Sequence, residues 1–301
     1  MLAEKPWKPE AVCRLCIALF ICQFLGAMVL AALRVFTRPA EINLWLVGAL
    51  TIAGAGCCIF GLYQLRRPWK LDDFSRKSLL LIFVVYAGLT MGLFVQHLAG
   101  DGKNDNLALR VSVGALCFQG LLIAFMPRFL REHGENWNGG FGLTIKPGPA
   151  LLYGVIVGLA FFKLAEVLQW ISMEIISRFG GEPQVQAAVE ALKKSNLWYD
   201  RAALAVVAVA LAPIAEELLF RGILYPAVKR GGFPRLALWG TSILFALIHM
   251  NGPTFLPLLL FALTLVFLYE WTGNLLAPLA AHALFNLLNF VKFLWYERQL
   301  G

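Results

Sequence analysis

Long apolar runs alternate along the chain with short polar stretches. A helix needs about 20 mainly apolar residues to cross the hydrocarbon layer of a membrane. Nine runs reach or approach this length, so the pattern predicts an all-α fold, a polytopic membrane helix bundle with about eight to nine transmembrane helices. The expected spans are residues 12–36, 44–65, 78–98, 107–126, 150–176, 202–219, 236–250, 255–271 and 276–295.

Two stretches between the runs indicate how the chain is divided. Residues 251–254, Asn-Gly-Pro-Thr, have the composition of a turn, and they predict a tight helical hairpin between the seventh and eighth runs. The glycine- and asparagine-rich stretch 134–142 has the composition of a linker. We therefore expect a domain of about four membrane helices over residues 1–140, with no role assigned to it, and a second domain over residues 141–301.

The stretch 183–195 mixes polar and apolar residues, unlike the runs around it. Val185, Ala188, Val189 and Leu192 recur at helical spacing, which is typical of an amphipathic helix at the membrane interface. A plain surface loop with helical propensity explains the same pattern equally well, and both interpretations stay open.

The composition agrees with a membrane protein. Hydrophobic residues make up 59% and charged residues only 15% of the 301 positions, whereas soluble domains have about 25% charged residues. This excludes an ordinary soluble enzyme, a disordered tail and a disulfide-rich module. The six cysteines lie in or beside apolar runs and are expected to be small buried hydrophobes.

The net charge of +8 comes from Lys and Arg residues between the apolar runs, so it indicates membrane topology rather than nucleic-acid binding. The basic cluster within residues 66–77 favours a cytoplasmic N-terminus, because positive residues are enriched on that side of a membrane. We expect an integral, multi-pass protein of the plasma membrane.

Ionisable residues inside apolar runs mark candidate sites, because each costs about 2.5–3.5 kcal/mol at the centre of a spanning helix. The sixth run ends in Glu216, Glu217 and Arg221. Glu217 and Arg221 are four residues apart on one helix face, whereas Glu216 points about 100° away. We therefore expect Glu217 to pair with Arg221 and Glu216 to face a cavity. An ion-pair cluster near the interface is the plainer alternative.

Two later runs carry histidines. Phe245 and His249 lie four residues apart in the seventh run, and the ninth run places His282, Asn286 and Asn289 on one helix face. A single intramembrane His is often a hydrogen-bonded core residue. Two histidines, an asparagine on the same face and a glutamate pair are better explained by a site in the C-terminal half of the chain.

Together, these residue types can hydrolyse an amide bond without a covalent enzyme intermediate. A carboxylate can take a proton from water while an imidazole orients that water. A second imidazole and an Asn amide can donate hydrogen bonds to an oxyanion. Alternatively, Glu216, His249 and His282 could bind a divalent metal such as zinc, since two His and one carboxylate suit a catalytic zinc site. The H-E-x-x-H and G-x-S-x-G signatures are absent.

At these residues the sequence resembles the CPBP family of intramembrane proteases, which includes the type II CAAX prenyl endopeptidases and the bacteriocin-processing and self-immunity proteins. The family motifs E-E-x-x-x-R, F-x-x-x-H and H-x-x-x-N stand here at Glu216 to Arg221, Phe245 to His249 and His282 to Asn286. The resemblance covers about residues 150–295 and does not include the first four runs.

The resemblance implies a helical, membrane-embedded peptidase. It implies that Glu216 and His249 activate water and that His282 and Asn286 form the oxyanion hole. Glu217, Arg221 and Phe245 fill the remaining motif positions and are expected to support the site. The family has also been described as metalloproteases, and the sequence leaves a metal cofactor open.

The leading hypothesis is an intramembrane endopeptidase that cleaves a membrane-associated protein or peptide within the lipid bilayer. The family name suggests prenylated CAAX C-termini, but no feature of the sequence indicates a prenyl-binding cavity. One alternative is a non-catalytic membrane interaction or immunity protein on the same scaffold. Another is a transporter with a proton or ion relay, although the sequence shows neither broken helices nor an inverted repeat.

Overall fold

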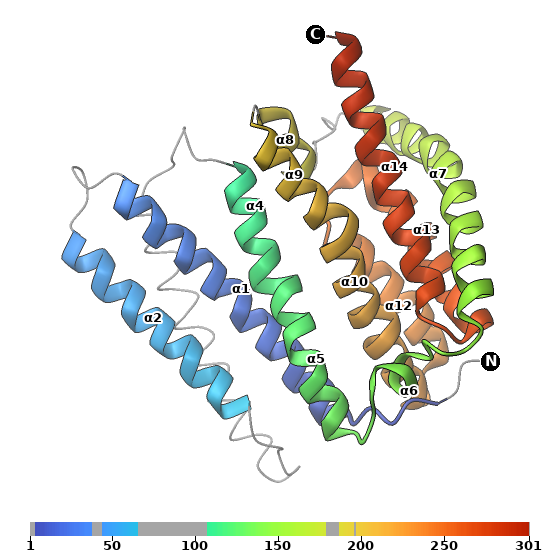
Figure 1. The fold of residues 1–301 in the computed structure, drawn as a ribbon, viewed down its shortest axis with the longest axis horizontal. Coiled ribbons are helices and arrows are strands. Elements are labelled where there is room, and N and C mark those ends of the chain that lie inside the picture. Colours follow the sequence, from blue (N-terminus) through green and yellow to red (C-terminus); the bar gives the residue numbers. More distant parts are fainter. Residues whose placement is uncertain (1–3, 38–43, 66–106, 179–186, 196, 301) are drawn as a thin grey trace. The chain divides into compact units, whose positions relative to one another are not determined.

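The structure is a computed structural model that describes residues 4–37, 44–65, 107–178, 187–195 and 197–300 (Figure 1). Within these ranges the regular secondary structure is helical throughout, without a strand, which confirms the predicted all-α class. The predicted span 78–98 lies outside the described residues.

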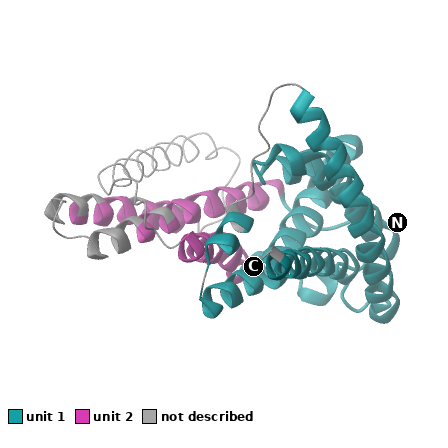
Figure 2. Ribbon diagram, turned by 90° about the horizontal axis from the view of Figure 1, so that it is seen from above, with its two compact units in different colours: residues 1–8, 126–301 teal, residues 9–125 magenta. Residues whose placement is uncertain are grey.

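The chain forms two compact units. One unit comprises Pro9–Phe125, and the other comprises Met1–Lys8 together with Met126–Gly301 (Figure 2, magenta and teal). The first residues of the chain therefore pack with its C-terminal part. Compact units reflect packing rather than independent folding, so the expected domain boundary near residue 140 stays a prediction.

The unit of Pro9–Phe125 is built from apolar helices. Its described core places Ala18 and Ile21 against Cys58, with Leu62 and Phe125 around them. Cys22 and Cys58 are buried, as expected for small hydrophobes, whereas Cys13 is exposed. The helices are α1 (Pro9–Thr37), α2 (Leu44–Leu65), α4 (Leu107–Ala115), the π-helix η2 (Leu116–Gly120) and the start of α5 (Leu121–Glu132).

The other unit carries the three motifs. Its helices after α5 are α6 (Trp137–Phe141), α7 (Pro147–Arg178), α8 (Ala187–Lys194), α9 (Trp198–Val206), the π-helix η3 (Val207–Leu211), α10 (Ala212–Glu217), the π-helix η4 (Leu218–Leu224), α11 (Tyr225–Arg230), α12 (Pro234–Leu247), α13 (Gly252–Thr272) and α14 (Leu276–Leu300). Helix α8 lies inside the stretch 183–195, so residues 187–194 of this stretch are helical rather than a loop.

Six helices in the described part of the chain are long and apolar enough to cross a membrane, which makes this an integral, multi-pass membrane protein. They cover Pro9–Leu30, Leu107–Glu132, Pro147–Arg178, Trp198–Arg230, Gly252–Thr272 and Leu276–Gln299. Two more of the predicted spans contain apolar helices that are shorter than these six, Thr51–Tyr63 and Pro234–Leu247. The plasma-membrane location and the cytoplasmic N-terminus stay predictions.

Small residues bring α7 and α14 into close contact. A Cβ atom on Gly154 would overlap the carbonyl oxygen of Ala277, and one on Gly158 would lie 2.9 Å from that of Ala281. Glycines spaced four apart allow two membrane helices to approach at backbone distance. Because Ala281 directly precedes His282, this contact sets the position of the third motif.

Asn274 fixes the start of α14. Its Nδ2 donates to the carbonyls of Leu143 and Ile145, at 3.3 and 2.7 Å, and its Oδ1 accepts the backbone N–H of Leu276 at 2.8 Å. The side chain is fully buried, so these bonds satisfy polar groups that water cannot reach. The loop before α7 is thereby joined to the helix that carries His282.

Candidate active site

Glu216 and Glu217 end α10, in the middle of a long helical segment that changes register on either side. The π-helix η3 precedes α10 and the π-helix η4 follows it. Pro213 and Pro226 lie within this segment and have no backbone N–H to give to a preceding carbonyl. Single π-turns inside α-helices frequently occur at functional sites.

Glu217 and Arg221 form a buried ion pair, as their spacing predicts. The Arg221 NH1 group donates to Glu217 Oε1 at 2.9 Å, and both side chains are at most 1% exposed. Arg221 also donates through NH2 to the carbonyl of Ala262 at 3.1 Å. Its guanidinium lies 4.6 Å from the centre of the Phe245 ring, so the phenylalanine of the second motif covers the charge.

Glu217 also holds His282. Its Oε1 atom lies 2.7 Å from His282 Nδ1. Because the carboxylate paired with Arg221 can only accept, Nδ1 of His282 donates the hydrogen. This contact orients the ring so that Nε2 points toward Glu216, an arrangement that the sequence did not predict.

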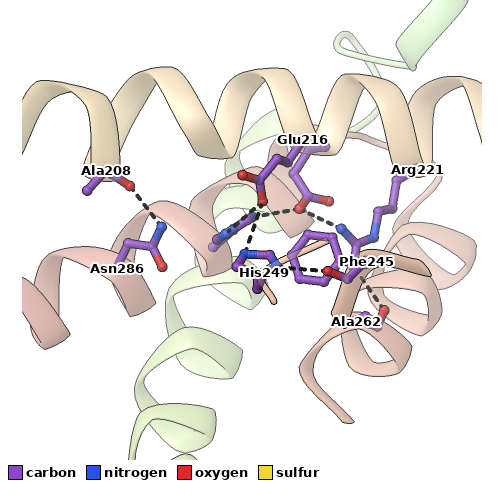
Figure 3. A network of polar contacts seen from close by, with 9 residues as sticks. Ala208, Glu216, Arg221, Phe245, His249, Ala262 and Asn286 are labelled. Atoms are coloured by element: carbon purple, nitrogen blue, oxygen red, sulfur yellow. Dashed lines mark hydrogen bonds and ion pairs between the residues drawn. The ribbon is translucent and has the colours of Figure 1, made fainter. Parts of the chain in front are cut away.

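Glu216 faces both imidazoles (Figure 3). Its Oε2 atom lies 3.9 Å from His282 Nε2 and 4.0 Å from His249 Nε2. The other nitrogen of His249 donates to the carbonyl of Phe245 at 2.7 Å, which leaves Nε2 as an acceptor in the neutral ring. Glu216 Oε2 is buried and makes no direct hydrogen bond. Separations of this size exceed a hydrogen bond and suit a bridging water molecule.

Asn286 lies to one side of this cluster and is tied to the backbone. Its Nδ2 donates to the carbonyl of Ala208 in η3 at 2.8 Å (Figure 3). The N–H of Ala212, the usual α-helical partner of that carbonyl, goes to Val207 instead, and residue 213 is a proline. Asn286 therefore donates to a carbonyl that has lost its α-helical N–H partner in the π-turn. The second amide hydrogen of Asn286 is not used in this bond.

The last residue of the predicted stripe does not join the site. Asn289 is exposed and donates to the carbonyl of Phe285 in its own helix at 2.8 Å. The structure thus brings together Glu216, Glu217, Arg221, Phe245, His249 and His282. Asn286 of α14 lies beside them and is bonded to η3 (Figure 3).

The open question of a divalent metal concerns Glu216, His249 and His282. At a tetrahedral zinc ion with bonds of about 2.0–2.1 Å, ligand atoms lie roughly 3.4 Å apart. Here the carboxylate oxygen lies 3.9 and 4.0 Å from the imidazole nitrogens. Among the residues that the structure describes, no group of three or more His, Cys, Asp or Glu side chains could hold a metal ion. The separations between these side chains therefore do not fit the joint coordination of one zinc ion.

Sequence reasoning missed the contacts that hold the site from outside the motifs. The Gly154 and Gly158 pair was a readable signal, because two small residues four apart in an apolar helix mark close helix packing. The bond from Arg221 to the Ala262 carbonyl had no such signal, because a backbone acceptor can lie beside any residue type.

The fold and the site define an integral helical membrane protein with a buried glutamate–histidine–arginine cluster between its C-terminal helices. Residues 198–288 match the family model of the type II CAAX prenyl endopeptidase Rce1-like proteins. The segment that carries Glu216, His249, His282 and Asn286 therefore matches this protease family, in agreement with the resemblance to CPBP proteins.

A shorter similarity links the chain to one curated protein. It is 36% identical over 76 residues to the uncharacterized protein YpbD of Bacillus subtilis (strain 168). The match covers 24% of this chain and 36% of that protein, so the chain spans about a third of the length of this relative. No solved structure matches the chain.

Proposed function

We propose that this protein is an intramembrane endopeptidase that cleaves a peptide bond of a membrane-associated protein or peptide. One observation carries the proposal: Glu216 Oε2 faces the Nε2 atoms of both His249 and His282 at 3.9–4.0 Å, in a buried position between three helices. The Rce1-like match over the same residues supports a peptidase.

Glu216 is the general base in this proposal. A water molecule between Glu216 Oε2 and His249 Nε2 gives its proton to the carboxylate, and its oxygen attacks the carbonyl carbon of the peptide bond. His249 accepts a hydrogen bond from the same water, because its Nδ1–H is held by the Phe245 carbonyl. Glu216 then passes the proton to the leaving amine, and the peptide bond breaks without a covalent enzyme intermediate.

His282 and Asn286 stabilise the oxyanion in this proposal. Doubly protonated His282 donates Nδ1–H to Glu217 and has a second N–H, at Nε2, for the oxyanion. The charge balance supports this form, because the carboxylates of Glu216 and Glu217 outnumber the Arg221 guanidinium by one in a buried site. The second amide hydrogen of Asn286 is the other donor.

The test compares membrane-protein N-termini by mass spectrometry in cells that express the wild type, Glu216→Gln or Glu174→Gln at matched levels. Glu174 is an exposed residue of α7 paired with Arg178, so its variant is the matched control. We expect new termini with the wild type and the control, and none with Glu216→Gln. The same termini in all three samples would overturn the role of Glu216. Folded protein without new termini in any sample would favour the non-catalytic membrane interaction or immunity protein.

A second experiment addresses the substrate. Purified protein is given two peptides of one sequence that ends in a CAAX tetrapeptide, one farnesylated and the other free. Cleavage of the farnesylated peptide alone would indicate a prenyl-protein substrate. Cleavage of both, or of neither while cellular termini still appear, would indicate that recognition depends on the peptide segment and not on the lipid.

A further inference from the structure

The residues before the first helix pack into the motif-bearing unit. We call residues Glu4–Lys8 the N-terminal strap; they belong to the same compact unit as Met126–Gly301. Trp7 in this strap is only 1% exposed, and Lys5 is 6% exposed. Deep burial of both side chains in a segment without secondary structure indicates that the strap is held by specific contacts.

The central contact of the strap is made by the Trp7 indole. Its Nε1 donates to the carbonyl of Gly222 at 2.7 Å, across a separation of 215 residues. In a regular α-helix the Gly222 carbonyl would accept the N–H of residue 226, but Pro226 has none. Trp7 therefore supplies a hydrogen bond in place of the α-helical donor that Pro226 lacks.

Gly222 is also held by aromatic packing. A Cβ atom at this position would lie 2.7 Å from the ring of Phe141, so only glycine fits here. The Trp7 ring packs against Phe129 and Phe141, with ring centres 5.2 and 6.2 Å away. Gly222 directly follows Arg221, so the strap and Phe141 together hold the η4 turn that carries the arginine.

Separate hydrogen bonds hold Lys5 and Lys8, on either side of Trp7. The Lys8 N–H donates to His133 Nε2 at 2.9 Å, while His133 Nδ1 donates to the Phe129 carbonyl at 2.7 Å. Lys5 Nζ donates to the carbonyl of Gly139 at 3.1 Å, and burial lowers the pKa of this lysine against the opposing effect of Glu135. Arg230, at the end of α11, donates to the Lys5 carbonyl at 3.0 Å.

We propose that the N-terminal strap is a positioning element of the active site, in which Trp7, through the Gly222 carbonyl, fixes the η4 turn and so holds Arg221 on Glu217. Glu217 in turn orients His282. Trp7 is a positioning residue, because it acts through the helix backbone and contacts none of the reacting groups. The catalytic part of this inference rests on the proposed function, whereas its structural part does not.

Hydrogen–deuterium exchange tests the structural part on the full-length protein. Trp7→Phe keeps an aromatic ring and removes only the N–H donor. Trp239→Phe is the matched control, because Trp239 is 51% exposed on α12. We expect amide exchange in residues 218–224 to rise roughly tenfold in Trp7→Phe and to stay unchanged in the control. Unchanged exchange there, or an equal rise throughout the unit, would overturn the proposal.

Kinetics test the catalytic part, with a fluorogenic peptide built on a cleavage site that appears with the wild type and not with Glu216→Gln. We expect Trp7→Phe to lower kcat about tenfold and to leave KM unchanged, because Trp7 acts on the position of Arg221 through the Gly222 carbonyl. A change in KM alone would overturn the positioning role. If no cleavage site depends on Glu216 in cells while Trp7→Phe still raises exchange in residues 218–224, the strap holds the turn and the peptidase function is the part that fails.

Discussion

Glu217 Oε1 lies 2.7 Å from His282 Nδ1, although the two residues are 65 positions apart on α10 and α14. The same oxygen accepts a hydrogen bond from Arg221. One carboxylate oxygen thus joins the first motif to the third. Glu217 thereby orients His282, and Glu216 is the carboxylate that faces the Nε2 atoms of both histidines.

The buried Glu217–Arg221 pair predicts a strong coupling between these two residues. Glu217→Gln leaves the Arg221 guanidinium buried without its counter-ion, so we expect the free energy of unfolding to fall by about 3–5 kcal/mol. The double variant with Arg221→Met removes both charges and should lose less than the single variant. Unfolding of the purified variants in detergent measures the cycle. Additive losses would contradict a direct pair.

The α7–α14 contact predicts a position that tolerates no side chain. In Gly154→Ala the new Cβ overlaps the Ala277 carbonyl, so we expect the free energy of unfolding to fall by about 1–3 kcal/mol and proteolysis to be lost with it. Gly148→Ala is the control, because a Cβ on Gly148, in the first turn of the same helix, meets no atom within 4 Å. Thermal unfolding of both variants distinguishes them, and equal stability would contradict the close packing.

Asn286 is expected to have two separable roles. Asn286→Ala removes the donor to the Ala208 carbonyl, which should lower the free energy of unfolding by about 1–3 kcal/mol. Loss of an oxyanion donor should lower kcat about 10²- to 10³-fold. Asn289→Ala, on the exposed part of the same helix, should change neither quantity. Reduced stability with normal turnover would show that Asn286 only joins α14 to η3 and does not contribute to the oxyanion hole.

Metal removal gives a direct test of the water mechanism. Glu216 lies 3.9–4.0 Å from both imidazole nitrogens, further than two ligands of one zinc ion, so we expect cleavage to survive a chelator. The measurement is the cleavage rate of protein dialysed against EDTA and then supplied with Zn²⁺. Activity that disappears on dialysis and returns with zinc would assign Glu216, His249 and His282 as ligands.

The membrane helices and the first motif were readable along the chain because both depend on local rules. The thickness of the bilayer sets the length of each apolar run, and α7 and α14 accordingly lie where residues 150–176 and 276–295 predict them. The spacing of four residues also predicts the Glu217–Arg221 pair. The two π-turns beside the glutamates were not expected, although Pro213 and Pro226 lie in the same helical segment.

The partners of the remaining site residues depend on how the helices pack. Glu217 with His282, Asn286 with Ala208 and Trp7 with Gly222 are separated by 65, 78 and 215 residues. Two of the acceptors are backbone carbonyls, which carry no residue-specific signal. The motifs therefore identify the candidate site residues from sequence alone. The orientation of these side chains depends on two features of the packing. Small residues let α7 and α14 approach closely, and prolines remove N–H donors, so that some backbone carbonyls bond to distant side chains instead. A carbonyl without its helical partner accepts a hydrogen bond from any donor that packing brings within reach.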